Sequence, residues 1–259
     1  MDFNGVVEKL HHYPIKGLSA QPLETVSLAA GEGFPFDRVF GFARHDSGFD
    51  PARPMPLPKD RFFVLLRDEE LAKLKTRFDP ETRHLGIQVD GETVFDDDLS
   101  TPSGIEAALT FLSDMFELPP EKRPVFAHAA PHRFTDVSVV SKEMMNAVSL
   151  INLASVRDLG DRIGTEVDPL RFRGNIYFDG WAPGSELELV GREISIGEAR
   201  LKVVKRTRRC AATEVNPQTA ERDIRILHQL KQHYGHLDMG VYAEVLSPGR
   251  IAPGDRIST

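Results

Sequence analysis

The chain has 259 residues, of which 41% are hydrophobic and 27% charged, as in ordinary soluble globular proteins with one large domain or two small ones. A net charge of -7 at pH 7 disfavours non-specific binding to nucleic acid, and no stretch approaches the roughly 20 apolar residues that a membrane helix needs. One cysteine and an N-terminus that does not read as a secretory signal predict a reducing compartment, the cytoplasm.

The first half of the chain predicts short strands and two helices. Strand-like segments span 6–16, 24–29, 38–44 and 61–66, and the four prolines of 50–60 predict a rigid exposed loop. Helical spacing of Leu71, Leu74 and Phe78 predicts a helix within 67–78. Residues 84–97 predict a hairpin with Asp90-Gly91 at its turn, and 101–118 predict a helix that Thr101 caps.

The second half predicts a strand-rich unit. The proline-rich segment 119–134 marks a boundary, so we expect one domain over 1–118 and another over 119–259. Ser155 is expected to open a short helix, and Asp223 to cap a second helix over 223–234 that ends at Gly235. Strands are expected at 137–141, 175–178, 186–191, 193–197, 199–206, 240–246 and 250–257. The fold class expected is mostly β with peripheral helices, with a barrel-like second domain after a smaller β-rich one.

Cys210 is the only cysteine, and it follows the basic run 205–209. It therefore has no partner for an intrachain disulfide. Cations beside a thiol favour the thiolate form, which attacks electrophiles and binds soft metals. Two plainer interpretations stay open at this point: a free cysteine is often a buried packing residue, and arginines often protect an exposed strand edge.

Two other motifs carry cations. In 171–175 (RFRGN), Arg171 and Arg173 are expected on one side of an extended chain, where they would grip a phosphate, and Asn175 would pair with a heterocycle. In 13–17 (YPIKG), Lys16 is expected at a strand exit beside a glycine, and 36–38 (FDR) begins another strand with Arg38. The alternatives are surface ion pairs and turn residues.

Histidines and acidic clusters carry weaker patterns. The three histidines of 228–236 do not share one helix face, and HExxH and CxxC motifs are absent from the sequence. The acidic clusters 68–70 and 96–98 are interpreted as solvated faces, one of them at a helix start. We expect neither group to form a catalytic centre.

The order of these motifs resembles the MOSC-domain proteins, whose name refers to the C-terminal domain of molybdenum-cofactor sulfurase. The resemblance rests on YPIKG, GFPFDRVF, LASV, RFRGNIYF, RRCAATEVNPQT and GVYAEVLSPGRIAPGD, which together span nearly the whole chain. Residues 1–118 are similar to the β-barrel domain that often precedes MOSC. Each motif is weak alone, and their order and spacing make the resemblance specific.

The resemblance implies a site as well as a fold. It implies a molybdenum-pterin cofactor, with Cys210 as the molybdenum ligand and the catalytic residue, as in the amidoxime-reducing branch of the family. Cofactor-binding positions implied by the same match are Lys16, Arg38, Ser155, Arg173, Asn175 and Arg208. Pyridoxal phosphate binding is also associated with the family, at the level of the family only. Small-molecule substrates are implied, without nucleic acid or membrane partners.

The sequence departs from the family pattern at three places. Gly17 follows Lys16 where relatives often carry a hydroxyl or thiol residue, and Arg208 stands where a small polar residue is common. Some relatives carry an iron–sulfur domain, which needs four cysteines; this sequence has one. We therefore expect electrons to come from a separate redox protein.

Three functions remain in competition. The first is a molybdenum oxidoreductase that reduces N-hydroxylated compounds. The second is a sulfur carrier that holds a persulfide on Cys210, and the third is a non-catalytic cofactor-binding module that needs the basic pocket without the thiol. We expect a basic cleft near Cys210, with Lys16 and Arg173 in the same pocket.

Overall fold

The computed structural model of the protein describes residues 4–259. Its largest element is a seven-stranded barrel, closed because β1 pairs with β10 on one side and β15 on the other. In order around the barrel the strands are β1 (Asn4–His12), β10 (Ile176–Asp179), β9 (Val148–Asn152), β13 (Asp238–Ser247), β12 (Ala199–Arg208), β11 (Glu193–Ile196) and β15 (Arg256–Ser258). β9 and β10 run parallel and the other neighbours antiparallel.

Buried and exposed side chains alternate along the barrel strands, and the buried ones form the core of the barrel. In β12 the side chains of Ala199, Leu201 and Val203 are buried while the intervening residues are more exposed, as the two-residue period of a strand requires. β9, by contrast, is buried at all five positions, because it lies between β10 and β13 and is covered by helices. The short strand β2 (Gln21–Leu23) pairs with β1, and β3 (Val26–Leu28) and β14 (Gly249–Ile251) form a separate two-stranded sheet.

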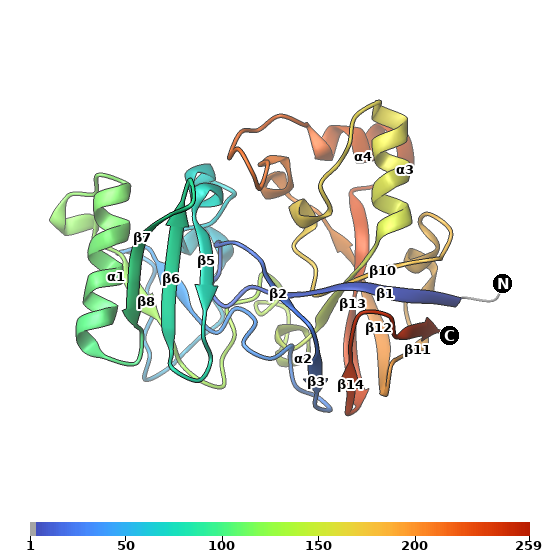
Figure 1. The fold of residues 1–259 in the computed structure, drawn as a ribbon, viewed down its shortest axis with the longest axis horizontal. Coiled ribbons are helices and arrows are strands. Elements are labelled where there is room, and N and C mark those ends of the chain that lie inside the picture. Colours follow the sequence, from blue (N-terminus) through green and yellow to red (C-terminus); the bar gives the residue numbers. More distant parts are fainter. Residues whose placement is uncertain (1–3) are drawn as a thin grey trace.

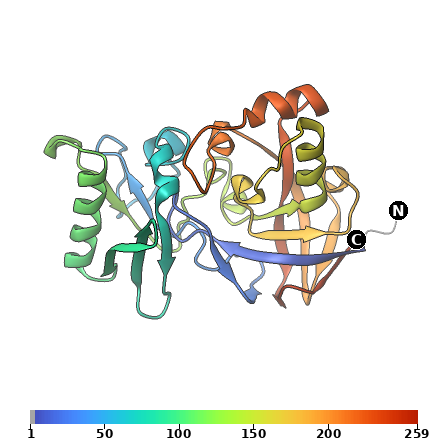
Figure 2. The ribbon, with the colours of Figure 1, turned by 45° about the horizontal axis from the view of Figure 1, so that its top comes forward.

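Two helices cover one side of the barrel. They are α3 (Leu153–Ile163) and α4 (Ile226–Tyr234), which lie next to each other in both ribbon views (Figures 1 and 2). Their apolar faces meet Ile151, Phe172 and Tyr177 in a shared cluster. A third, single-turn helix, α2 (Lys142–Met145), is capped by the Ser141 side chain.

A smaller β-rich unit lies beside the barrel (Figure 1). Its antiparallel sheet contains β5 (Lys75–Phe78), β6 (His84–Val89) and β7 (Glu92–Asp98), and α1 (Pro102–Met115) packs against it. Next to them, β4 (Gly41–Ala43) pairs with β8 (Val125–Ala127). The expected fold class, a barrel-like unit with a smaller β-rich one and peripheral helices, is confirmed.

The strand β1 lies near the start of the sequence but pairs with strands from its second half. It belongs to the first 118 residues, yet it pairs with strands that begin at Ile176 and Arg256. The barrel of the C-terminal part is thus closed by a strand from the N-terminal part. The division of the chain into 1–118 and 119–259 stays a prediction. Every helix within residues 4–259 is too short or too polar to cross a lipid bilayer.

Local signals predicted some elements correctly. The Asp90-Gly91 turn has positive φ at both residues, 52° and 85°, as a two-residue hairpin of this type requires. Thr101 caps α1 by accepting a hydrogen bond of 3.0 Å from the Gly104 amide. The helix over 223–234 exists but begins at Ile226, because Asp223 is engaged by Arg171 instead of acting as a cap.

Other predicted elements were wrong. Residues 67–78 form a 3-10 helix and then β5, and 186–191 overlap a 3-10 helix where a strand was expected. Residues 61–66 and 137–141 form no strand, and the N-cap of α3 is Asn152 rather than Ser155. The 3-10 helices span Lys59–Arg61, Glu69–Lys73, Pro120–Lys122, Pro169–Phe172, Ser185–Leu189 and Ala211–Glu214.

His11 in β1 gives the fold a predicted sensitivity to acid. It is buried, and its ring centroid lies 5.3 Å from that of Tyr177 in an edge-to-face arrangement. Burial, followed by the charges of Lys9 and His12, lowers its pKa from 6.5 to about 4. Between pH 6.5 and about 4, His11 is therefore protonated in the unfolded chain and mostly neutral in the folded protein. Stability should be full above this pH and fall as the pH drops towards 4, by on the order of 2 kcal/mol from this residue.

The measurement is the free energy of unfolding in urea at neutral pH and near pH 4.5. We expect His11→Gln to lose less stability between the two conditions than the parent does. The matched control is His228→Gln, at an exposed position of α4, which should follow the parent. An acid response in His11→Gln as large as in the parent would contradict the assignment.

Candidate functional site

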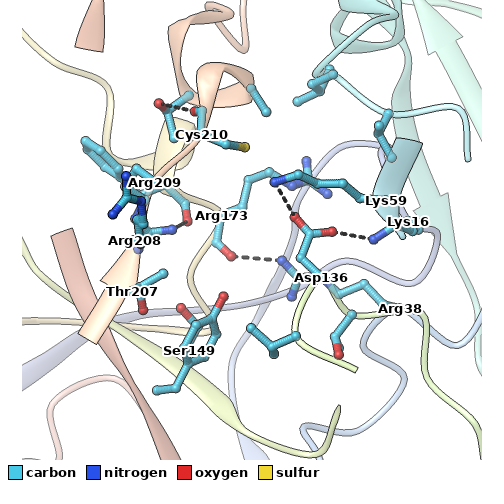
Figure 3. Close-up of a pocket in the computed structure, with 18 of the residues that line it drawn as sticks. Lys16, Arg38, Lys59, Asp136, Ser149, Arg173, Thr207, Arg208, Arg209 and Cys210 are labelled. Atoms are coloured by element: carbon cyan, nitrogen blue, oxygen red, sulfur yellow. Dashed lines mark hydrogen bonds and ion pairs between the residues drawn. The ribbon is translucent and has the colours of Figure 1, made fainter. Parts of the chain in front are cut away.

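Cys210 lies where β12 ends. The preceding residue, Arg209, anchors the strand end: its guanidinium donates to the carbonyl oxygens of Met239 and Phe172, the latter at 2.8 Å. After Cys210 the chain turns into the 3-10 helix Ala211–Glu214, held by Thr213, whose backbone N–H and hydroxyl both donate to the Cys210 carbonyl oxygen at 3.0 and 2.9 Å. The sulfur points into a cavity (Figure 3).

This cavity has a volume of about 250 Å³ and is lined from both parts of the chain. Lys16, Arg38 and Lys59 enter it from the N-terminal part, and the barrel side provides Arg173 and Cys210 among others. Six of the seven residues predicted for the site line it together: Lys16, Arg38, Arg173, Asn175, Arg208 and Cys210. The expectation that Lys16 and Arg173 share a pocket with Cys210 therefore agrees with the geometry.

The seventh predicted residue, Ser155, does not line this cavity. It lies inside α3, where its hydroxyl donates to the buried carboxylate of Glu186 at 2.8 Å and accepts from the Gly184 amide at 2.9 Å. Burial raises the pKa of Glu186, against the hydrogen bonds from Asn152 and Ser155, which lower it. These contacts tie α3 to the 3-10 helix Ser185–Leu189.

Arg38 and Arg173 flank the same aromatic ring. Their guanidinium carbons lie 4.4 and 4.3 Å from the centroid of Tyr13, and Arg38 also donates to the Arg173 carbonyl oxygen at 2.9 Å. Both residues have φ of 50°, in the left-handed region, where a non-glycine residue costs of order 1–3 kcal/mol. The surrounding contacts hold both arginines in this conformation and direct them to the cavity.

The charges of these two arginines are balanced differently. Burial lowers the pKa of Arg38, but the carboxylate of Asp37 at 2.5 Å outweighs it and raises the pKa overall. For Arg173, burial and the neighbouring charge of Arg38 both act to lower the pKa. Arg173 is thus the less compensated cation of the two, which favours an anion in the cavity beside it.

The segment 171–175 is not extended as predicted. Arg171 lies in the 3-10 helix Pro169–Phe172 and forms two bonds of 2.7 Å with the carboxylate of Asp223, while Arg173 turns into the left-handed region. The amide of Asn175 accepts from the Ser149 backbone N–H at 3.1 Å and donates to the His11 carbonyl oxygen at 3.3 Å, so it orders β1 and β9 from the cavity wall. Arg208 is exposed at the cavity edge.

Sequence reasoning missed two charged residues of the cavity, Asp136 and Lys59. The carboxylate of Asp136 lies between two ammonium groups: Lys16 contacts Oδ1, and Lys59 lies 3.7 Å from Oδ2 (Figure 3). Enclosure raises the pKa of Asp136, but the positive charges of Lys16 and Lys59 outweigh it and hold that pKa well below its usual range. Lys59 follows the four prolines of a loop predicted to be exposed, and Asp136 directly precedes the predicted strand 137–141, so no local pattern marked either one.

Two buried hydroxyl groups in the cavity wall indicate whether a polar ligand fits this cavity. Ser149 Oγ and Thr207 Oγ1 line the cavity and have no hydrogen-bond partner within residues 4–259, although both residues are at least 95% buried. Buried polar atoms in folded proteins nearly always find partners. Unused hydroxyls beside several cations and one thiol fit a group with ring heteroatoms, an anionic end and a metal that prefers sulfur.

Comparisons with known proteins find relatives of this chain. Residues 130–258 match the model of the MOSC domain. The chain is 25% identical to mitochondrial amidoxime-reducing component 1 from Mus musculus, over 98% of this chain and 82% of that protein. Among solved structures, the YuaD protein from Bacillus subtilis aligns with a TM-score of 0.46 and 13% identity over 100% of this chain and 96% of its own.

A second solved structure, YiiM from Geobacillus stearothermophilus, aligns with a TM-score of 0.34 and 18% identity over 43% of this chain and 53% of its own. The matched segment 130–258 contains Cys210, Arg173 and the unpartnered hydroxyls of Ser149 and Thr207. Residues 130–258 of this protein belong to the MOSC domain family.

Proposed function

We propose that the protein is a molybdenum-cofactor-dependent oxidoreductase that reduces N-hydroxylated compounds. The observation that carries the proposal is the single thiol of Cys210, which points into a cationic cavity with two buried hydroxyls that lack partners. The similarity to an amidoxime-reducing component over 98% of the chain supports the choice of reaction.

In this proposal each part of the cavity has one task. Cys210 would bind the metal through sulfur, since a thiolate is a soft ligand. Lys16, Arg38, Arg173 and Arg208 would hold the phosphate of the cofactor, because guanidinium and ammonium groups bind such anions through charge-assisted hydrogen bonds. Ser149 and Thr207 would bond its heterocycle through the hydroxyls that have no partner.

When bound, the cofactor supplies the two-electron chemistry that cleaves an N–O bond. The overall reaction consumes two electrons and two protons, converts the N-hydroxyl group to N–H and releases water. The chain's own residues orient the substrate and enclose it: Leu65, Leu66 and Val137 line the cavity with apolar atoms, while Lys59 and Asp136 present polar atoms near Cys210.

The electrons would come from a separate redox protein. An iron–sulfur centre of the usual kind takes four cysteine ligands, and the sequence contains one cysteine. We propose that Cys210 serves the reaction site and that an electron-transfer partner delivers electrons to it. A cytoplasmic location and a small-molecule substrate complete the proposal.

The test is to produce the protein in a host that makes the cofactor, and to measure molybdenum and pterin per chain together with reduction of benzamidoxime by reduced methyl viologen. Close to one metal per chain and turnover would support the reductase. A persulfide on Cys210 without metal would instead favour a sulfur carrier. Full cofactor content without turnover of any N-hydroxylated compound would favour a binding module.

A further inference from the structure

Lys59 is a cavity residue that reaches the site from the opposite side to Cys210. It opens the short 3-10 helix Lys59–Arg61 at the end of the proline-rich loop, in the N-terminal part of the chain. Its side chain is two-thirds buried, and its amino group points towards the sulfur of Cys210 across the cavity (Figure 3). The two residues meet only because the loop packs against the barrel.

A chain of charges holds Lys59 in this place. Lys16 is buried and donates to the Phe134 carbonyl oxygen at 2.9 Å and to the carboxylate of Asp136. The other oxygen of that carboxylate faces Lys59 at 3.7 Å. Since Asp136 is fixed by Lys16 on one side, it restricts where the Lys59 amino group can lie on the other.

Electrostatics keep Lys59 a hydrogen-bond donor. A lysine amino group is charged at neutral pH, and the facing carboxylate of Asp136 favours that charged form. The amino group is therefore an ammonium with three N–H donors, of which Asp136 occupies one side. Another of them is available for the sulfur.

We propose that Lys59 is a positioning residue that donates an N–H···S hydrogen bond to Cys210 and thereby sets how much electron density the sulfur gives to a bound metal. The inference rests on the proposed role of Cys210 as a ligand. Hydrogen bonds to ligating sulfur atoms withdraw electron density from the metal and raise its reduction potential. Lys59 would thus tune the site from outside the segment that matches the MOSC domain.

The experiment compares Lys59→Met, Lys59→Arg and Lys73→Met in protein that carries the cofactor. Lys73 is an exposed lysine of the same part of the chain, paired with Glu70, and is the matched control. The readouts are molybdenum per chain, the Mo(V) electron paramagnetic resonance spectrum and the midpoint potential. We expect Lys59→Met to keep its metal, to change the spectrum and to shift the potential to more negative values, with partial return in Lys59→Arg and none of these changes in Lys73→Met.

A Lys59→Met protein with the parent's spectrum and potential would overturn the proposal. Loss of cofactor in Lys59→Met, restored in Lys59→Arg, would also overturn it, because Lys59 would then bind the cofactor rather than the sulfur.

A second measurement separates this inference from the proposed function. In cofactor-free protein, alkylation by iodoacetamide at neutral pH reports on Cys210 alone, because the sequence has no other cysteine. We expect the rate to fall severalfold in Lys59→Met, to recover in Lys59→Arg and to stay unchanged in Lys73→Met. An unchanged rate in Lys59→Met would refute the hydrogen bond, whereas absence of metal from the parent protein would refute only the role of Cys210 as a ligand.

Discussion

Cys210→Ser is expected to lose its molybdenum and at least 99% of its reductase activity, while its fold persists. A serine hydroxyl is a hard, weakly acidic ligand and does not replace a thiolate at a metal that prefers sulfur. Cys210 is partly exposed and its backbone is held by Thr213, so the exchange should change the free energy of unfolding by no more than about 1 kcal/mol. Metal analysis, turnover and urea unfolding of one preparation measure all three effects.

Ser155→Ala is the matched comparison for this result. Ser155 was predicted for the cofactor site from the sequence, but it bonds Glu186 inside α3 and does not line the cavity. The variant should lose about 1–3 kcal/mol of stability, because a buried carboxylate loses a donor, and should keep its molybdenum. Metal retained in Cys210→Ser would contradict the ligand assignment, and metal lost from a folded Ser155→Ala would place Ser155 in the site after all.

Gly17→Ala is expected to lower stability by about 2–4 kcal/mol and to lower cofactor content with it. Gly17 has φ of 87°, where an L-residue is strained, and a Cβ there would overlap the carbonyl oxygen of Phe63. To relieve the overlap, the backbone beside Lys16 has to shift, which disturbs the contact of Lys16 with Asp136. Urea unfolding and molybdenum content measure the two losses.

Gly48→Ala separates the two causes of that loss. Gly48 has a similar φ of 75°, but a Cβ there meets no atom within 4 Å. The exchange should therefore show only the cost of the left-handed backbone, about 1 kcal/mol, with unchanged cofactor content. Equal losses at the two glycines would mean that the contact with Phe63 adds nothing to the effect of backbone conformation.

Much of the site followed from residue chemistry and motif order in the sequence. The types of Lys16, Arg38, Arg173 and Cys210 suit an anionic cofactor with a metal, and the structure places all four around one cavity. The places of Asp136 and Lys59 in the site could not be predicted from the sequence, because they depend on a contact between residues more than 70 positions apart. No local pattern records that a proline-rich loop packs against the end of a barrel strand.

The fold was predictable where a short segment determines its own conformation. The helix capped by Thr101 and the turn at Asp90-Gly91 depend on neighbouring residues alone, and both are present. In 67–78, by contrast, Leu71, Leu74 and Phe78 are all buried in one cluster, and a 3-10 helix followed by a strand buries them as well as a helix would. The spacing of apolar residues could not distinguish these solutions, since only the surrounding core does.

The pairing of β1 with β15 has a consequence for how the protein is made. β1 is synthesised well before its neighbour β15, which follows about 240 residues later. Until then the barrel stays open along the seam between these two strands. Contacts so distant in sequence form slowly. The closed barrel that carries Cys210 is therefore completed only after synthesis of β15, and a cofactor that needs the closed barrel is captured only after that point.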